Sequence, residues 1–157
     1  MKEQSWASID KSGWGEGPWQ TEPDKKQWRD PKTGMPCLMV RNASGALCGY
    51  VGVTEEHSLF NKSYNSAFAC INVHGGLTFS AGCDEGASPE HSICHIDPDN
   101  PGPVWWFGFD CAHSGDAGPA LAAIPGMRRY DTYSTYRDLA FVTDECASLA
   151  QQLQQIG

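Results

Sequence analysis

The most constraining feature of this sequence is the segment 105–116, which reads WWFGFDCAHSGD. Its first five residues are large and apolar apart from one glycine, a composition typical of a strand buried within a sheet. Its second half is polar and contains Asp110, His113 and Asp116. Since aromatic residues form rigid walls and loops at strand ends often carry chemistry, the segment predicts a buried strand that delivers a functional site. Trp106 is the aromatic residue that we expect to contact a ligand there.

Four further apolar segments, each bounded by turn-forming residues, are typical of strands: 37–41, 46–53, 67–73 and 77–80. The first two flank an Asn-Ala-Ser-Gly turn and predict a β-hairpin. Long loops rich in glycine, proline and polar residues occupy 81–103 and 112–133. Loops of this length in a small domain are usually functional.

The last part of the chain predicts a helix over 134–156. Its apolar residues recur at alternating spacings of three and four, which is the stripe of an amphipathic helix: Leu139, Val142, Cys146, Leu149, Leu153 and Ile156. Ser134 or Thr135 is the expected N-cap, with Asp138 in the first turn. We therefore expect an α+β fold, in which about five antiparallel strands form a sheet with one long C-terminal helix packed on it.

The length of 157 residues predicts a single domain. Residues 1–35 contain four tryptophans with no strand or helix period, which predicts an irregular arm pinned to the domain by its indoles. Residues 36–133 then hold the sheet and the site loops, and residues 134–156 the C-terminal helix.

The formal net charge of −8 argues against non-specific binding to nucleic acid, which requires a basic surface. No apolar run approaches the roughly 20 residues of a membrane-spanning helix. The first residues do not resemble a signal peptide, so we expect a cytoplasmic protein. Its partner would be a small molecule, and the composition is also compatible with a homo-oligomer.

Seven cysteines without a secretion signal argue against a disulfide framework. Four of them lie in apolar surroundings and are expected in the core: Cys37, Cys48, Cys70 and Cys146. Cys83, Cys94 and Cys111 lie near histidines, and their role stays open.

The candidate catalytic residues are His74, Asp110, His113 and Asp116. Asp110, His113 and Asp116 offer the hard oxygen and imidazole ligands that bind a divalent metal. They also suit a general base with an orienting acid. The structural alternative is that Asp110 caps the following turn and His113 bonds to the backbone.

A second candidate group would bind the ligand. Gly75 and Gly76 follow a predicted strand, where their amides suit an anion or form a simple turn. Arg137 lies at the start of the predicted helix and suits a phosphate or carboxylate, or pairs with Asp131 or Asp138.

Aromatic residues beside Arg128 and Arg129 suit a planar ligand such as a nucleobase, or ordinary packing: Tyr130, Tyr133 and Tyr136.

Two alternatives use the cysteines. A structural zinc would draw on Cys83, His91, Cys94, His95, Cys111 and His113, although their spacing matches no common zinc pattern. His95 is otherwise a ligand-binding candidate. Nucleophilic catalysis would pair Cys94 or Cys111 with His74.

Several motifs together resemble a family of small bacterial and phage proteins: His74-Gly75-Gly76-Leu77-Thr78, Cys94-His95, the run from Trp105 to Asp116, and Tyr136-Arg137-Asp138-Leu139. The resemblance covers most of the chain after residue 35. It implies a compact domain in a bacterial or phage-infected cytoplasm and implies no reaction. A phage setting raises proteins that bind or degrade the nucleotide signals of bacterial immunity.

These patterns lead to two functional hypotheses. The first is a small hydrolase, metal-assisted or not, that acts on a phosphorylated or nucleotide-like ligand and serves phage counter-defence. The second is a binding protein without catalysis, either a nucleotide-signal sponge or a protein inhibitor. A third, purely structural role predicts that the His/Asp cluster tolerates substitution.

Overall fold

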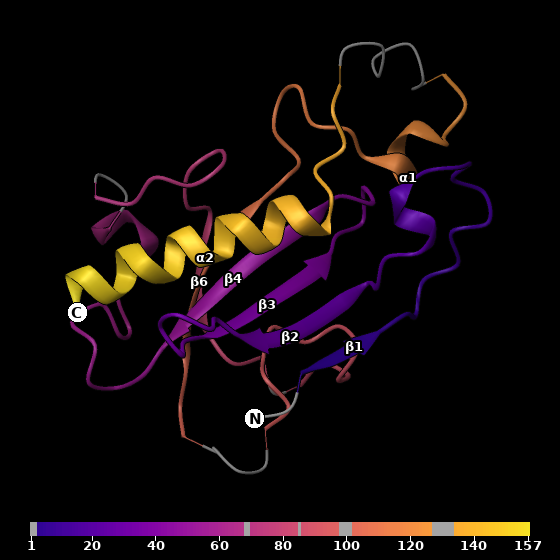
Figure 1. The fold of residues 1–157 in the computed structure, drawn as a ribbon. Helices are drawn as coiled ribbons and strands as arrows, with labels where there is room; N and C mark the ends of the chain where they lie inside the picture. The colour runs from indigo at the N-terminus through magenta and orange to yellow at the C-terminus, as the bar shows by residue number, and fades with distance from the viewer. Residues whose placement is uncertain (1–2, 68–69, 85, 98–101, 127–133) are drawn as a thin grey trace.

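The computed structural model describes residues 3–67, 70–84, 86–97, 102–126 and 134–157. Its centre is one antiparallel sheet of six strands in the order β1-β2-β3-β4-β6-β5, with the helix α2 (Leu139–Ile156) lying across one face (Figure 1). The strands are β1 (Gln4–Trp6), β2 (Lys25–Arg29), β3 (Pro36–Arg41), β4 (Leu47–Val53), β5 (Phe79–Gly82) and β6 (Trp105–Asp110). The short helices are η1 (Pro18–Gln20), η2 (Tyr64–Ser66) and α1 (Pro119–Ala122). The expected α+β fold is confirmed.

The hairpin predicted from 37–53 forms β3 and β4, in the middle of the sheet. All seven residues of β4 are buried, because both faces of the sheet are covered at this strand. On one face α2 packs its apolar stripe over β3 and β4, with Cys146, Leu149 and Leu153 inaccessible to solvent. This layer is the main core.

The opposite face carries a smaller apolar cluster formed by Leu38, Cys48, Tyr50 and Trp106. Residues 86–97, called here the covering segment, lie over this face. They are held by Lys25 and Gln27 of β2, which bond to the segment's backbone oxygens. Each of these two β2 side chains is fully buried. Burying an ammonium or an amide group costs free energy unless the group forms hydrogen bonds, and the backbone oxygens of the covering segment supply them.

The prediction of an irregular arm over residues 1–35 is wrong for two of its stretches. Residues 4–6 and 25–29 are strands β1 and β2, and they extend the sheet beyond β3. Lys25 and Gln27 are polar at buried positions, so the stretch lacks the alternation that identifies a half-buried strand. These two strands are stabilised by pairing with distant residues and by hydrogen bonds to the covering segment, neither of which the local residue pattern reveals.

The strands expected at 67–73 and 77–80 also differ from the structure. The expected strand at 67–73 is absent from the described part, where Cys70 and Ile71 follow η2 in a turn; residues 68 and 69 lie outside the described residues. Cys70 is exposed, not in the core. The strand expected at 77–80 is shifted to Phe79–Gly82.

The helix starts at Leu139 and not at Ser134 or Thr135. Asp138 is its N-cap, and the side chain of Asp138 accepts a hydrogen bond from the Phe141 amide at 2.9 Å. Glu22 accepts a second from the Leu139 amide at 2.7 Å. Two carboxylates therefore satisfy the first amides of the helix, which fixes its start. No helix among the described residues is long and apolar enough to cross a membrane.

Arg41, at the end of β3, ties the N-terminal strands to the C-terminal helix. Its guanidinium is inaccessible and donates to Asp24 Oδ1 at 2.9 Å, to the Gly45 carbonyl at 2.9 Å and to the Tyr136 hydroxyl at 2.8 Å. The Tyr136 hydroxyl donates onward to Glu22. We call these five residues the Arg41 network.

Asp24 is the most heavily used acceptor of this network. Lys11 donates to Asp24 Oδ1 at 2.6 Å, and the Ser8 and Ile9 amides bond to Oδ2. Burial alone would raise the pKa of Asp24, but the hydrogen bonds from Lys11, Ile9 and Arg41 outweigh it and hold the pKa below its ordinary value.

Replacing Arg41 with methionine tests whether this network supports the whole fold. We expect Arg41→Met to lower the free energy of unfolding by about 3–5 kcal/mol, because Glu22 loses Arg41 as its cationic partner and Asp24 is left with Lys11 alone. Urea denaturation followed by circular dichroism measures the change.

Lys26→Met is the control. Lys26 is also on a strand, and its ion pair with Glu3, at 3.2 Å, is open to solvent because the Glu3 side chain is 63% exposed. A surface pair of this kind contributes less than about 1 kcal/mol. Equal losses in the two variants would contradict the role of the Arg41 network.

Candidate functional site

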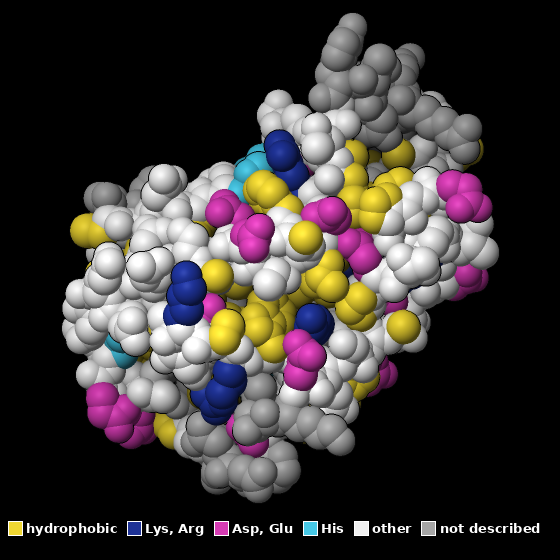
Figure 2. All heavy atoms as spheres, in the orientation of Figure 1, with side chains coloured by type: hydrophobic (Ala, Val, Ile, Leu, Met, Phe, Trp, Pro, Cys, Tyr) yellow, Lys and Arg dark blue, Asp and Glu magenta, His cyan; other side chains and the backbone are white. Residues whose placement is uncertain are grey.

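The candidate site lies beside the N-terminal end of α2, where three segments distant in sequence meet. Figure 2 shows histidine, basic, acidic and apolar side chains gathered at this place on the surface. His74 comes from the turn before β5, Asp116 from the loop after β6, and Arg137 from the residues before α2. The backbone of Thr135 pairs with that of Gly115 and Ala117, which brings the last two segments together.

Asp116 is the buried centre of this site. Its side chain is 1% exposed, and its Oδ2 lies 2.7 Å from His74 Nε2 while its Oδ1 accepts from Arg137 Nε at 3.0 Å. The His113 amide donates to Oδ2 at 3.0 Å. Burial alone would raise the pKa of Asp116, but these hydrogen bonds, led by that of His74, lower it below the ordinary value.

His74 is held on several sides. Its amide donates to Glu145 Oε1 at 2.8 Å, and its ring packs edge-on against Phe141 with centroids 5.2 Å apart. Because Nε2 faces a carboxylate, that nitrogen carries the proton of the neutral ring, and Nδ1 is the basic nitrogen. No described residue bonds to Nδ1.

His113 and Asp110 form a second imidazole–carboxylate pair. His113 Nε2 is buried and lies 3.2 Å from Asp110 Oδ1, a close contact without hydrogen-bond geometry. Asp110 also accepts from the Thr78 hydroxyl at 3.1 Å and from the Ala112 amide at 3.0 Å. The Ala112 bond is the cap that the structural interpretation expected. The rings of His74 and His113 are 6.0 Å apart between centroids.

Gly75 makes room for the His113 ring. Gly75 has a φ of +70°, and a Cβ placed on it would lie 2.1 Å from His113 Cδ2 and Nε2. The Gly76 amide donates to the Val73 carbonyl at 2.9 Å and closes the turn. Gly75 thus serves the packing of an imidazole, and the Gly76 amide is not available to an anion.

Arg137 is positioned by Asp116 and by the face of Phe141, which lies 5.1 Å from the guanidinium carbon. The predicted help from helix amides is wrong for Leu139 and Phe141, because Glu22 and Asp138 already occupy them. Arg137 is 31% exposed, so its guanidinium still meets solvent beside His74. Arg128, Arg129, Tyr130, Asp131 and Tyr133 lie outside the described residues.

A hollow of about 430 Å³ opens next to His113 and Asp110. It is lined by residues of β4, β5, β6 and the neighbouring turns, with the rings of Tyr50 and Phe79 as its aromatic side chains; the other lining residues include Asn42, Cys48, Thr78 and Phe109. We call it the site hollow. It gives a small ligand access to the second imidazole–carboxylate pair.

His95 and Trp106 are not part of this site. His95 belongs to the covering segment, and its Nε2 donates to the Cys37 carbonyl at 2.7 Å; Trp106 lies beneath that segment and is inaccessible to solvent. Burial lowers the pKa of His95 to about 4, so the ring stays neutral. The ligand-binding prediction for these two residues therefore does not apply to the site at α2.

The argument against disulfides is wrong for Cys83 and Cys94, whose role the sequence left open and which form a disulfide. These sulfur atoms are consequently unavailable as zinc ligands, and Cys94 is unavailable as a nucleophile. Burial raises the pKa of the Cys111 thiol far above its ordinary value, which keeps it protonated. Cysteine catalysis with His74 has no support in this arrangement.

The described residues contain no group of three or more His, Cys, Asp or Glu side chains arranged to hold a metal ion. The predicted ligands Asp110, His113 and Asp116 do not converge, because both Asp116 oxygens face His74 and Arg137. The metal interpretation is therefore weaker than the acid–base interpretation.

Glu22 and Glu145 also support the site, and sequence reasoning missed both. Glu145 lies four residues after Phe141 on the same face of α2, so helical spacing alone could have placed it beside His74. No local signal identifies Glu22, which is 117 residues away from the amide it caps.

Comparisons with protein-family models, curated proteins and solved structures find no match to this chain. Function therefore has to be inferred from the arrangement of these side chains.

Gly75→Ala tests the packing of His113 on the turn. We expect this variant to lose more stability than Gly34→Ala, whose φ of +73° is similar but whose Cβ would meet nothing within 4 Å. The shared backbone strain costs about 1–2 kcal/mol, and the clash with His113 adds about 1–3 kcal/mol. Thermal unfolding of both variants measures the difference, and equal losses would show that His113 does not lie against Gly75.

Proposed function

We propose that this protein is a small hydrolase that uses His74 and His113 as a general base and a general acid on a phosphorylated, nucleotide-like ligand. The observation that carries the proposal is the buried Asp116 carboxylate, which holds His74 through Nε2 and leaves Nδ1 as the basic nitrogen. A carboxylate that orients an imidazole in this way is a recurring device of general base catalysis.

In the proposed scheme the two imidazoles act on opposite sides of one reacting group. Their ring centroids are 6.0 Å apart, and hydrolysis of a phosphate ester places the attacking water and the leaving oxygen in line across phosphorus. In this scheme His74 Nδ1 removes a proton from water and His113 donates one to the leaving oxygen.

Arg137 and the site hollow support the choice of ligand. The partly exposed guanidinium next to His74 supplies positive charge for a phosphate group. Phe79 and Tyr50 supply aromatic walls for a planar group in the hollow next to His113. The scheme needs no metal for its proton transfers. A role in phage counter-defence remains a prediction from the resemblance alone.

His74→Ala and Asp110→Asn test this function. We expect both to reduce hydrolysis of chromogenic phosphate mono- and diesters by about 10²–10⁴-fold, because each removes part of an acid–base pair. Initial rates with and without chelator measure the effect, and circular dichroism checks the fold. His91→Ala is the matched control, since His91 is exposed and its backbone amide, which the substitution keeps, bonds to the Ser88 carbonyl.

Full activity in both site variants would contradict the proposal. Recovery of an unchanged nucleotide from the denatured wild-type protein, with no turnover of any ester, would favour the binding-protein hypothesis.

A further inference from the structure

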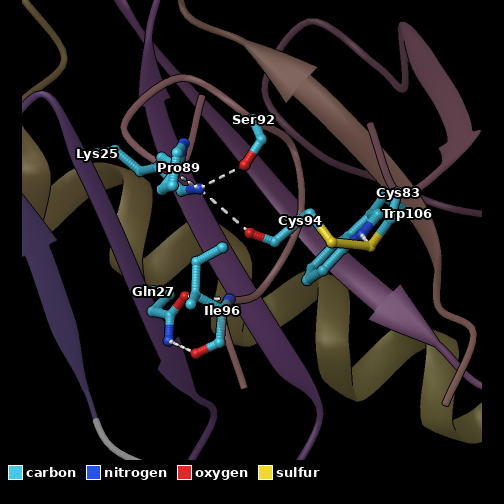
Figure 3. Close-up of a disulfide and its surroundings, with 8 residues drawn as sticks. All are labelled: Lys25, Gln27, Cys83, Pro89, Ser92, Cys94, Ile96 and Trp106. Atoms are coloured by element: carbon cyan, nitrogen blue, oxygen red, sulfur yellow. Dashed lines mark hydrogen bonds between the residues drawn. A yellow bond between two sulfur atoms is a disulfide. The ribbon is translucent and has the colours of Figure 1, made fainter. Parts of the chain in front are cut away.

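The second face of the sheet carries a separate arrangement, in which a disulfide closes the covering segment over β6. Cys94 of the segment bonds to Cys83, which directly follows β5 (Figure 3). Trp106 of β6 lies between this disulfide and the sheet, in the smaller apolar cluster. The disulfide therefore joins the end of an edge strand to the segment that covers its neighbour.

The covering segment has other attachments that do not depend on the disulfide. The Lys25 ammonium donates to the Pro89 carbonyl at 2.7 Å, to Ser92 Oγ at 3.1 Å and to the Cys94 carbonyl at 3.2 Å. Gln27 exchanges two hydrogen bonds with the backbone of Ile96, at 2.8 and 2.9 Å. Breaking the disulfide thus frees Cys83 and the end of β5, while residues 89–96 stay on the sheet.

The disulfide is accessible to a reductant. Both cysteines are partly exposed and line a hollow of about 370 Å³, together with Phe60, His95 and Trp105. A small dithiol can enter a hollow of this size. This hollow is distinct from the site hollow, which is lined by other residues.

Cys83 is the better leaving group of the two. The Trp106 indole N–H donates to Cys83 Sγ at 3.5 Å, and a hydrogen bond to sulfur stabilises a departing thiolate. Attack on Cys94 therefore releases Cys83 into a position where a donor already faces it.

The four buried free cysteines cannot compete in thiol–disulfide exchange. Burial raises the pKa of Cys37 to about 12 and that of Cys48 to about 11, and it raises the pKa of Cys111 and Cys146 well above the ordinary value. Thiolates carry out exchange, so these four cysteines stay inert. Redox chemistry is confined to Cys83 and Cys94, apart from the exposed thiol of Cys70.

The disulfide also adjoins the wall of the site hollow. Cys83 and Phe79 pack against the cluster that contains Tyr50 and Trp106. Tyr50 and Phe79, whose rings meet edge-on with centroids 5.2 Å apart, line the site hollow beside Asp110. Release of Cys83 therefore loosens β5 at the strand that forms this wall.

We propose that the Cys83–Cys94 disulfide is a reversible switch, opened by a dithiol, that sets how firmly β5 and the wall of the site hollow are held. Its effect on turnover rests on the proposed function, whereas its effect on β5 does not.

The exchange proceeds in two steps and needs one dithiol. A thiolate of the dithiol attacks Cys94 Sγ, the Cys83–Cys94 bond breaks, and Cys83 leaves as a thiolate that takes up a proton. The second thiol of the reductant loses its proton and attacks the reductant's first sulfur, which is bonded to Cys94 in the mixed disulfide. This attack releases Cys94 as a thiolate that takes up a proton. Two electrons pass to the protein, and the dithiol becomes a disulfide.

Hydrogen exchange measured by mass spectrometry on the full chain, before and after dithiothreitol, tests the switch. We expect amides of Phe79–Gly82 to exchange about tenfold faster after reduction, because the loop constraint is lost, while amides of α2 stay protected. The variant Cys83→Ala/Cys94→Ala, without reductant, should match the reduced protein. Cys70→Ala should behave as the wild type, and alkylation should label Cys83 and Cys94 only after reduction.

Resistance to dithiothreitol under native conditions, unchanged exchange in β5, or loss of protection throughout α2 would each overturn the switch. Ester hydrolysis in the two redox states is measured alongside. If neither state hydrolyses an ester, the proposed function fails, and the exchange of β5 still decides the switch.

Discussion

The fold depends on the buried guanidinium of Arg41. It joins Asp24 of the segment before β2, the hairpin carbonyl of Gly45 and the hydroxyl of Tyr136 before α2. These groups are far apart in sequence, and none can be buried alone without a large cost in free energy. Because the Tyr136 hydroxyl and the Leu139 amide both bond to Glu22, the same network fixes where α2 begins.

The position of the candidate site follows from that start. Arg137 lies between Tyr136, which belongs to the Arg41 network, and the first turn of α2, so its guanidinium can reach the buried Asp116. Asp116 then orients His74, which Glu145 and Phe141 of α2 hold from the other side. The chemistry therefore depends on a framework that contains none of the proposed acid–base residues.

Apolar patterns predict the part of the fold that local sequence determines. The aromatic run of β6, the hairpin of β3 and β4 and the stripe of α2 were all recognisable. The sequence also placed Asp110, His113 and Asp116 close together in the chain, but the three side chains do not converge, because Asp116 faces His74 and Arg137. The pattern did not reveal β1 and β2, because buried polar residues such as Lys25 are compensated by partners more than 60 residues away. The disulfide, Glu22 and the pairing of Asp116 with His74 and Arg137 are likewise products of tertiary contact, which residue spacing does not encode.

The measurement that tests the account most directly is the tautomer of His74, read from long-range ¹⁵N–¹H correlations of the imidazole. The spectrum is recorded after raising the pH until the ring signals stop moving, so that the ring is neutral. A carboxylate 2.7 Å from Nε2 predicts that Nε2 carries the proton and Nδ1 is the basic nitrogen. Asp116→Asn should shift the tautomer balance. A ring protonated on Nδ1, or a tautomer unaffected by the Asp116 substitution, would contradict the orientation on which the proposed catalysis depends.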